Sequence, residues 1–172
     1  MTLTLDIPEL ETPRLTLRAP RVEEFPAYRA LFTSSRAVHI GEYDERSAWR
    51  EFASDAGHWV LFGYGPWHIL RKEDGALVGG VGLLNLDFYP EIELGWHLYD
   101  GFEGYGFATE AAVAARDWAF DDRGVPTLVS YIDRDNARSI AVAKRLGAKL
   151  DPNAQKVDAE DVVYRHSPER VQ

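Results

Sequence analysis

Residues 91–119 constrain the fold more than any other part of the sequence. They read EIELGWHLYDGFEGYGFATEAAVAARDWA, which predicts a strand, a short loop with three glycines, and a helix. Glycine lacks a Cβ, so such a loop can turn several backbone N–H groups toward one point. The first turn of the helix adds unpaired N–H donors and the positive end of its dipole. The stretch therefore predicts a binding site for a phosphate or pyrophosphate.

Length and composition limit the kinds of protein this chain can be. Its 172 residues, 45% of them hydrophobic, suit one domain spanning 1–172, with a core at 11–165. The absence of cysteine excludes disulfides and fits a reducing compartment. A net charge of −9 argues against nucleic acid as a partner and mildly favours a cationic substrate, although acidity also serves solubility. With no signal-peptide pattern and no apolar stretch of membrane-spanning length, we expect a cytoplasmic protein without a membrane partner.

Hydrophobic periodicity and turn residues divide the chain into strands and helices. Strands are expected at 14–18, 67–71, 76–84, 91–99, 127–132 and 162–165. Helices are expected at 22–32, 47–61, 106–122 and 136–146, and residues 33–46 are expected to form a loop. The middle strands form an antiparallel meander up to the glycine loop. The strand–helix–strand succession after that predicts parallel pairing through a right-handed crossover.

The glycine loop by itself is weak evidence for a particular ligand. Thr109 stands where the dinucleotide fingerprint would have its third glycine, and no Gly-Lys-Ser/Thr triplet follows to indicate a Walker loop. A second motif, NARSIAVAKRLGA, opens at Asn136 after the strand TLVSYID. Taken alone, Asn136 and Ser139 fit an ordinary helix cap and first turn better than a ligand contact.

The combination of these motifs is more specific than either part. The strand IELGW, the loop EGYGFATEA, the strand TLVSYID and the helix NARSIAVAKRLGA occur in an order that resembles the GCN5-related N-acetyltransferase superfamily. The similarity runs from about Glu11 to Tyr164 and is greatest to the ribosomal-protein-alanine acetyltransferase branch, whose start is similar to ETPRLTLRAPRVEEF. It implies an α+β (mixed α/β) fold. The sheet would be strongly twisted and mixed, with about six to seven strands splayed between the fourth and fifth and about four flanking helices.

The resemblance also implies that acetyl-CoA binds in the splay. The backbone amides that would hold its pyrophosphate belong to Gly104, Tyr105, Gly106, Phe107, Ala108 and Thr109. Main-chain groups of Trp96 and Leu98 and the side chain of Asn136 would bind the pantetheine arm. Ser139 would lie near the thioester sulfur, and Arg138 and Lys144 are candidates for the remaining phosphate. The superfamily loop usually begins with Gln or Arg, but here it begins with Glu103, whose carboxylate opposes an anionic ligand unless it points away.

The expected chemistry requires an amine that loses its proton before it attacks a thioester. Glu93, on the strand beside the splay, is the candidate base, directly or through water; the alternative is a solvated strand carboxylate. Ser139, by resemblance, and Tyr131 are candidate acids for the leaving thiolate. The five histidines show no ligand spacing, so no metal is expected. Candidates for the acceptor pocket are Trp59, Tyr64 and residues 39–43, although aromatic side chains more often pack in cores.

These features predict an acetyl-CoA-dependent N-acetyltransferase, an enzyme of the acyltransferase class, that acts on a primary amine. The amine would be a protein or peptide N-terminus or a small molecule. It would attack directly in a ternary complex, because no cysteine is present to carry an acyl group. Two alternatives stay open, a non-catalytic acyl-CoA-binding module without a working base and a nucleotide-binding protein. The acceptor is left undefined, and both a monomer and a homodimer are compatible with the sequence.

Overall fold

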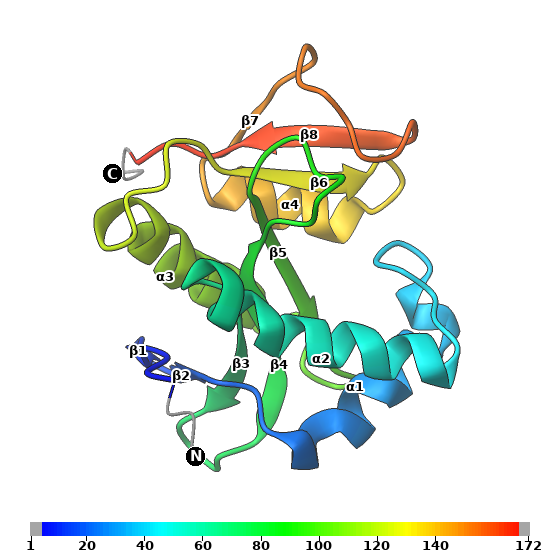
Figure 1. Ribbon diagram of the computed structural model, residues 1–172, viewed down its shortest axis with the longest axis vertical. Coiled ribbons are helices and arrows are strands. Elements are labelled where there is room, and N and C mark those ends of the chain that lie inside the picture. Colours follow the sequence, from blue (N-terminus) through cyan, green and yellow to red (C-terminus); the bar gives the residue numbers. More distant parts are fainter. Residues whose placement is uncertain (1–4, 169–172) are drawn as a thin grey trace.

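A computed structural model describes residues 5–168 and contains one mixed sheet (Figure 1). Across the sheet the strands lie in the order β1-β2-β3-β4-β5-β6-β8-β7. Their bounds are β1 (Leu10–Glu11), β2 (Leu15–Arg18), β3 (Pro66–Arg71), β4 (Leu77–Leu84), β5 (Glu93–Leu98), β6 (Val129–Asp133), β7 (Lys149–Leu150) and β8 (Asp161–Arg165). All neighbouring pairs are antiparallel except β5 and β6, which are parallel, as the crossover pattern predicts.

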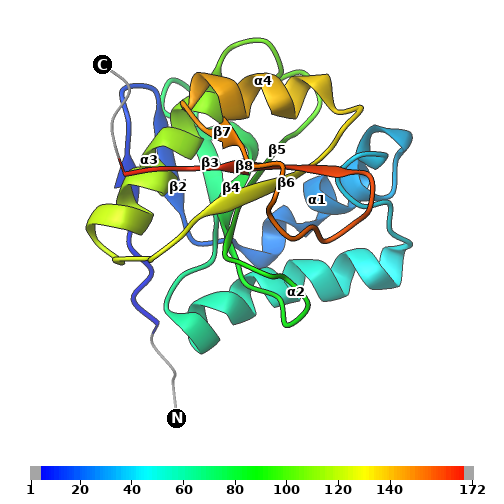
Figure 2. The same cartoon turned by 90° about the horizontal axis from the view of Figure 1, so that it is seen from above.

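Helices cover both faces of this sheet. The α-helices are α1 (Phe25–Phe32), α2 (Glu45–Phe62), α3 (Phe107–Asp121) and α4 (Ala137–Arg145), and the short 3-10 helices are η1 (Val22–Glu24) and η2 (Ser35–Ala37). Seen from above, α3 and α4 lie on one face of the sheet, and α1 and α2 lie on the other (Figure 2). The predicted α+β fold with a mixed sheet and four flanking helices is confirmed.

Local sequence signals explain where the helices begin and end. The Asp44 carboxylate accepts a hydrogen bond from the Ser47 N–H at 2.7 Å and starts α2. At the other end Gly63, with φ of 69°, adopts the left-handed conformation that terminates a helix. Gly57 does not interrupt α2, because its position on the helix is open and requires no special conformation. Pro26 lies in the first turn of α1, where its missing N–H has no partner to lose.

The sheet splits between β5 and β6. Glu93 and Val129 form the only register pair between these strands, and there the Val129 N–H donates to the Ile92 carbonyl at 3.0 Å. Beyond this pair the strands diverge (Figure 1). β5 and β6 are the fourth and fifth strands expected from the sequence, so the predicted position of the splay is confirmed.

Some element bounds differ from those expected. The two additional strands, β1 and β7, have two residues each, which is too short to show a period in the sequence. Part of the expected loop at 33–46 forms η2 and the first turn of α2, because Ser34 and Asp44 act as caps. The strand expected at 91–99 is shortened to Glu93–Leu98, and just before its start the Glu91 N–H donates to the Tyr131 hydroxyl and not to a neighbouring strand.

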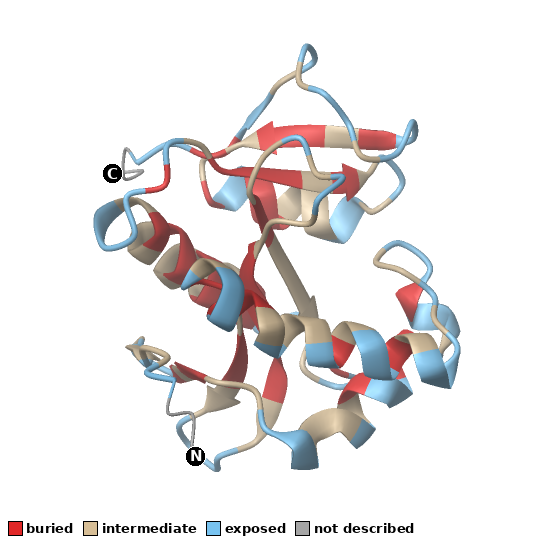
Figure 3. Ribbon diagram, viewed as in Figure 1, coloured by how far each residue is buried: buried red, intermediate tan, exposed pale blue. Residues whose placement is uncertain are grey.

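The main core lies between the sheet and α3, where buried residues are concentrated (Figure 3). The buried side of α3 is rich in alanine, which lets the helix backbone approach β4 and β5 closely. Trp59 packs edge-on against Trp67 at 4.8 Å and is 3% exposed, which places it in this core. Within residues 5–168, none of the helices combines the length and apolar character that crossing a bilayer requires.

Candidate active site

Two cavities meet at the splay. One, of about 520 Å³, lies between β4, β5, β6, α1 and α2, and we call it the acceptor cavity. The other, of about 1140 Å³, runs between the glycine loop and the start of α4, and we call it the cosubstrate cavity. The residues that line both cavities are Ile40, Trp96, His97, Asn136 and Ser139. A molecule bound in one cavity can therefore meet a molecule bound in the other at these residues.

The cosubstrate cavity contains the glycine loop that dominates the sequence. Gly104 and Gly106 have φ of 85° and 81°, the left-handed conformation that glycine adopts without strain. Gly106 is the N-cap of α3 and provides no side-chain cap, and the first helical bond runs from the Glu110 N–H to the Gly106 carbonyl. Within the described chain the N–H groups at 107–109 have no hydrogen-bond partner. These donors line the cavity and are available to an anion.

The carboxylate of Glu103 does not oppose an anion as strongly as the sequence suggests. It forms an ion pair with Arg36, which comes from η2, and accepts a hydrogen bond from the Gly101 N–H at 3.2 Å. The Arg36 charge neutralises Glu103, and this partner lies 67 residues away along the chain. The ion pair with Arg36 thus explains how Glu103, which departs from the family pattern, can lie beside an anion site.

The edge of β5 that faces the splay has no strand partner beyond Glu93, although the Leu98 carbonyl accepts a long hydrogen bond of 3.5 Å from Arg36. The carbonyls of Ile92 and Leu94 point toward β6, since they accept from the Val129 N–H and the Ser130 hydroxyl. Backbone direction alternates along a strand, so the N–H and C=O groups of Trp96 and Leu98 face the same side. Strand-like binding of an extended ligand here, as predicted for Trp96 and Leu98, has the required geometry.

The start of α4 supplies the polar side chains of the junction. The Asn136 side-chain oxygen accepts from the Ser139 N–H at 3.2 Å, so Asn136 does cap the helix. Its amide nitrogen has no partner among the described residues, which leaves a donor for a ligand. Arg138 lines the cosubstrate cavity together with Arg145, which the sequence reasoning missed. Lys144 is exposed and does not line either cavity.

Glu93 and Glu91 have the same side chain but opposite electrostatic environments. Glu93 is 9% exposed, and burial raises its pKa to about 7, although interactions with the Tyr131 backbone N–H and the Tyr89 hydroxyl act against the rise. Hydrogen bonds from Arg165, at 2.7 and 2.8 Å, lower the pKa of Glu91 to about 2. Of these two carboxyl groups, Glu93 is therefore the one suited to exchange a proton near neutral pH.

His97 lines both cavities but is a poorer base than Glu93. Burial, with a smaller contribution from His68, lowers its pKa to about 3, so the ring is neutral. Its Nε2 atom is buried and has no partner in the described part of the chain. Gly80 leaves room for this ring, since a Cβ on that residue would lie 2.5 Å from it. Strand alternation from Glu93 places His97 on the same face, which was the only sequence signal for it.

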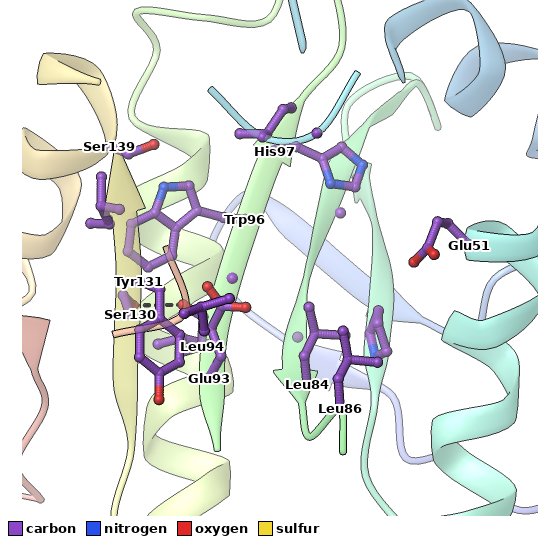
Figure 4. Close-up of a pocket in the computed structure, with 18 of the residues that line it drawn as sticks. Glu51, Leu84, Leu86, Glu93, Leu94, Trp96, His97, Ser130, Tyr131 and Ser139 are labelled. Atoms are coloured by element: carbon purple, nitrogen blue, oxygen red, sulfur yellow. Dashed lines mark hydrogen bonds between the residues drawn. The ribbon is translucent and has the colours of Figure 1, made fainter. Parts of the chain in front are cut away.

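The two candidate acids lie at different ends of the splay. Ser139 is at the junction of the cavities, whereas the Tyr131 hydroxyl points toward the start of β5 (Figure 4). That hydroxyl accepts a hydrogen bond from the Glu91 N–H at 3.0 Å. Burial raises the pKa of Tyr131, which keeps its proton in place at neutral pH. Position thus favours Ser139 over Tyr131 as the acid beside the cosubstrate.

The lining of the acceptor cavity agrees only in part with the expectation. His39, Ile40, Gly41 and Tyr43 line it as predicted. Trp59 and Tyr64 lie outside it, so this part of the prediction was wrong: Trp59 packs in the core and the Tyr64 hydroxyl accepts from Asn85 at 3.1 Å. One face of α2 contributes four polar residues that the sequence reasoning missed, Glu51, Ser54, Asp55 and His58.

Comparison with known proteins agrees with this geometry. The sequence pattern of the family described as the acetyltransferase (GNAT) domain matches residues 14–149, which is more than half of the chain. The chain belongs to the GNAT acetyltransferase family. The solved structure of an acetyltransferase from Agrobacterium tumefaciens strain C58 is similar, with 47% identity, a TM-score of 0.91, and coverage of 97% of this chain and 98% of that one. The predicted superfamily is thereby confirmed.

Other similar proteins are more distant. The chain is 28% identical to the Bacillus subtilis protein YkkB over 105 residues, which cover 60% of this chain and 61% of YkkB. It thus matches only about three fifths of that curated relative. The structure of RimL, a ribosomal-protein α-N-acetyltransferase in complex with coenzyme A, shares the fold at 18% identity, with a TM-score of 0.70 and coverage of 94% and 96%.

A buried hydroxyl holds the GNAT splay at a fixed width. Ser130 Oγ donates to the Leu94 carbonyl at 2.6 Å and lies 2.9 Å from His166 Nε2 (Figure 4). This side-chain bond joins β6 to β5 just after their backbone pairing ends. Since a carbonyl only accepts and the hydroxyl has one proton, the His166 Nε2–H must be the second donor.

Ser130→Ala is expected to reduce stability by about 1–3 kcal/mol, because it leaves buried polar groups of Leu94 and His166 without partners. Ser130→Thr, which keeps the hydroxyl, is the matched control and is expected to restore most of the loss. Denaturant unfolding of the three proteins measures the effect. A Ser130→Ala protein as stable as the unchanged one would show that this bond does not hold the splay.

Proposed function

We propose that this GNAT protein is an acetyl-CoA-dependent N-acetyltransferase that acts on a primary amine. One observation carries the proposal. A buried carboxyl with a pKa of about 7, Glu93, lines a cavity that meets a second cavity lined by free backbone amides, and the two share Asn136 and Ser139. A base on one side and an anion site on the other is the arrangement that acyl transfer from a thioester cosubstrate to an amine requires.

The cosubstrate cavity fits acetyl-CoA on several counts. The free N–H groups at 107–109 suit the pyrophosphate, and the splay-facing edge of β5 suits the amide groups of the pantetheine arm. Arg138 and Arg145 supply positive charge for a further phosphate. RimL, which shares the fold, is known in complex with coenzyme A. The lack of cysteine fits the reducing cytoplasm as the place of action.

The chain's own residues perform the proton transfers. Bound acetyl-CoA supplies a thioester carbon that the amine nitrogen attacks, so that an N–C bond forms, the C–S bond breaks and the sulfur leaves with the electron pair. Glu93 takes one proton from the ammonium before the attack, directly or through a water, and the second proton leaves the nitrogen for solvent after the N–C bond has formed. An α-amine with a pKa of ~7.7–8.0 matches this base within about one unit, while a lysine-like amine at ~10.4 depends more on desolvation in the cavity.

Two further groups act on the charge that develops. Backbone N–H groups on the free edge of β5 face the junction and can stabilise the oxygen of the attacked carbonyl. Ser139, which lines both cavities, donates a proton to the leaving sulfur in this proposal, and solvent then restores the proton. Tyr131 remains the second candidate for this acid.

A release assay for free coenzyme A tests the function. Purified protein and acetyl-CoA are incubated with amino acids, peptides, alkylamines, polyamines and aminoglycosides, and the product is identified by mass. Amine-dependent release with an N-acetyl product is the expected result. If acetyl-CoA protects the protein against heat but no amine is acetylated, the non-catalytic acyl-CoA-binding module is the correct function. Protection by ATP that acetyl-CoA cannot compete away would favour the nucleotide-binding alternative.

Asn136→Ala is expected to weaken acetyl-CoA binding about tenfold, because the pantetheine arm loses a hydrogen-bond donor. It also removes the α4 cap and costs about 1 kcal/mol of stability. Asn136→Ser separates the two effects, since its hydroxyl keeps a capping oxygen without the amide group. Titration calorimetry with both variants should show weaker binding in each, with normal stability in Asn136→Ser. Unchanged affinity in both would remove Asn136 from the cosubstrate site.

A further inference from the structure

The end of the acceptor cavity remote from the junction has polar groups that the proposed chemistry does not use. Glu51 and Asp55 lie one helical turn apart on α2 and line the cavity. Like charges at this spacing repel each other on a helix surface. Neither carboxylate has a hydrogen bond or ion pair within residues 5–168, whereas Glu24, Glu91 and Glu110 each pair with an arginine.

Burial raises the pKa of Asp55 well above its ordinary value, and the Glu51 charge raises it further. Holding this pair in the cavity therefore costs stability when both groups are ionised. A bound cation would reverse that cost by neutralising the pair. No lysine or arginine is among the described residues that line the cavity, so none of them neutralises Glu51 and Asp55.

His58, one turn further along α2, independently indicates a ligand that donates hydrogen bonds. It lines the cavity and is 5% exposed. Its Nδ1 lies 2.9 Å from the Ser54 carbonyl oxygen, which can only accept, so Nδ1 carries the proton. Nε2 is then a bare acceptor, and it is buried without a partner in the described part of the chain. A buried acceptor is normally satisfied by a donor, and an ammonium supplies up to three.

Aromatic rings continue from this acidic end toward Glu93. Tyr28 and Phe32 stack at 4.3 Å and line the cavity with Tyr43. Burial raises the pKa of Tyr43 to about 12, with added contributions from the charges of Glu51, Asp55 and Glu93. Tyr43 therefore lines the same cavity as the two carboxyl groups of α2 and the candidate base on β5, and the charges of all three act on it. Aromatic faces attract ammonium groups, so this wall suits a chain with a cation at each end.

We propose that the acceptor is a dication, a diamine or polyamine, with one nitrogen at Glu93 and a second held by Glu51, Asp55 and His58. This rests on the proposed function and adds the class of its acceptor. Figure 4 shows Glu51 pointing from α2 toward the strands, with Glu93 across from it on β5. The nitrogen at Glu93 loses its proton and takes the acetyl group as described above, and the second nitrogen keeps its proton throughout. The volume of about 520 Å³ suits a small linear molecule.

The test compares α,ω-diamines of increasing length with monoalkylamines of the same lengths, using the full chain, acetyl-CoA and the release assay. We expect kcat/KM for the best diamine to exceed that for its matched monoamine by about 10- to 100-fold, the gain of one charged hydrogen-bonded pair. Asp55→Asn is expected to collapse this ratio mainly through KM for the diamine. Glu45→Gln, an equal charge change on the exposed start of α2, should leave the ratio as it is.

A binding measurement separates failure of this inference from failure of the proposed function. Diamine without acetyl-CoA is expected to raise the melting temperature of the unchanged protein, and Asp55→Asn should abolish the rise. The same diamine-dependent rise with no acetylation of any amine would support the second cation site and refute the enzyme function. Acetylation of monoamines or peptides as efficient as that of diamines would overturn the dication proposal and leave the enzyme function standing.

Discussion

Glu93→Gln is expected to lower kcat at pH 7 by about 10²–10⁴-fold, because it removes a buried carboxyl whose pKa of about 7 suits it to accept a proton near neutrality beside the junction of the cavities. In the unchanged protein the rate should rise with pH through about 7, as the Glu93 carboxyl ionises. In the variant this rise should disappear, and the remaining activity should increase only as the amine itself loses its proton at higher pH.

The pH profile of kcat/KM measures this effect in the free enzyme. Glu91→Gln is the matched control, two residues away with the same chemical change, and its profile should keep the rise near 7, since its carboxylate is held by Arg165. A Glu93→Gln protein whose profile matches that of the unchanged enzyme would remove Glu93 as the base. His97 would not replace it, because a base with a pKa of about 3 is too weak.

The same substitution is expected to stabilise the fold at pH 8 by about 3 kcal/mol. The pKa of Glu93 is about 7 in the folded protein and 4.5 when exposed, and each unit is worth about 1.36 kcal/mol. The folded state thus binds the proton more tightly than the unfolded state does. The unchanged protein therefore loses stability as pH rises from about 4.5 to 7, whereas the Gln variant, which has no carboxyl, does not.

Denaturant unfolding at pH 4 and pH 8 tests this result. The two proteins should be close in stability at pH 4 and differ most at pH 8. Glu91→Gln should show the opposite sign: Arg165 lowers the pKa of Glu91, so this variant loses stability at neutral pH and recovers relative to the unchanged protein as pH falls toward 2. Equal stability of Glu93→Gln and the unchanged protein at pH 8 would mean that Glu93 does not carry a buried charge.

The sequence predicted the parts of this fold that depend on local patterns. The glycine loop, the start of α3 and the crossover to β6 follow from residues close together in the chain, whereas the position of the splay was implied by the family resemblance. β1 and β7 have two residues each and depend on pairing with distant strands, which no local period reveals.

The sequence predicted the residues of the candidate site only where they belong to a recognisable motif. Glu91 and Glu93 are two residues apart and look alike in the sequence, yet Arg165, more than seventy residues later, separates their pKa values. Arg36, which pairs with Glu103, belongs to residues 33–46, which were expected to form a loop. The acidic face of α2 escaped notice because a polar helix face is usually solvated, and only the packing of α2 against the sheet makes Glu51 and Asp55 line a cavity.

The contacts of η2 and its neighbours determine the shape of the opening between the two cavities. Arg36 is tied to Glu103 on the glycine loop, and His39 Nδ1 lies 2.9 Å from the Asp133 carboxylate at the end of β6. This short segment therefore bridges the gap on both sides, and Ile40 lines the passage beneath it. Two side-chain contacts therefore cross the opening, and a ligand that spans both cavities has to pass beside them. We expect a narrow unbranched chain to leave both contacts in place, whereas a bulky substituent next to the reacting nitrogen is expected to displace one of them.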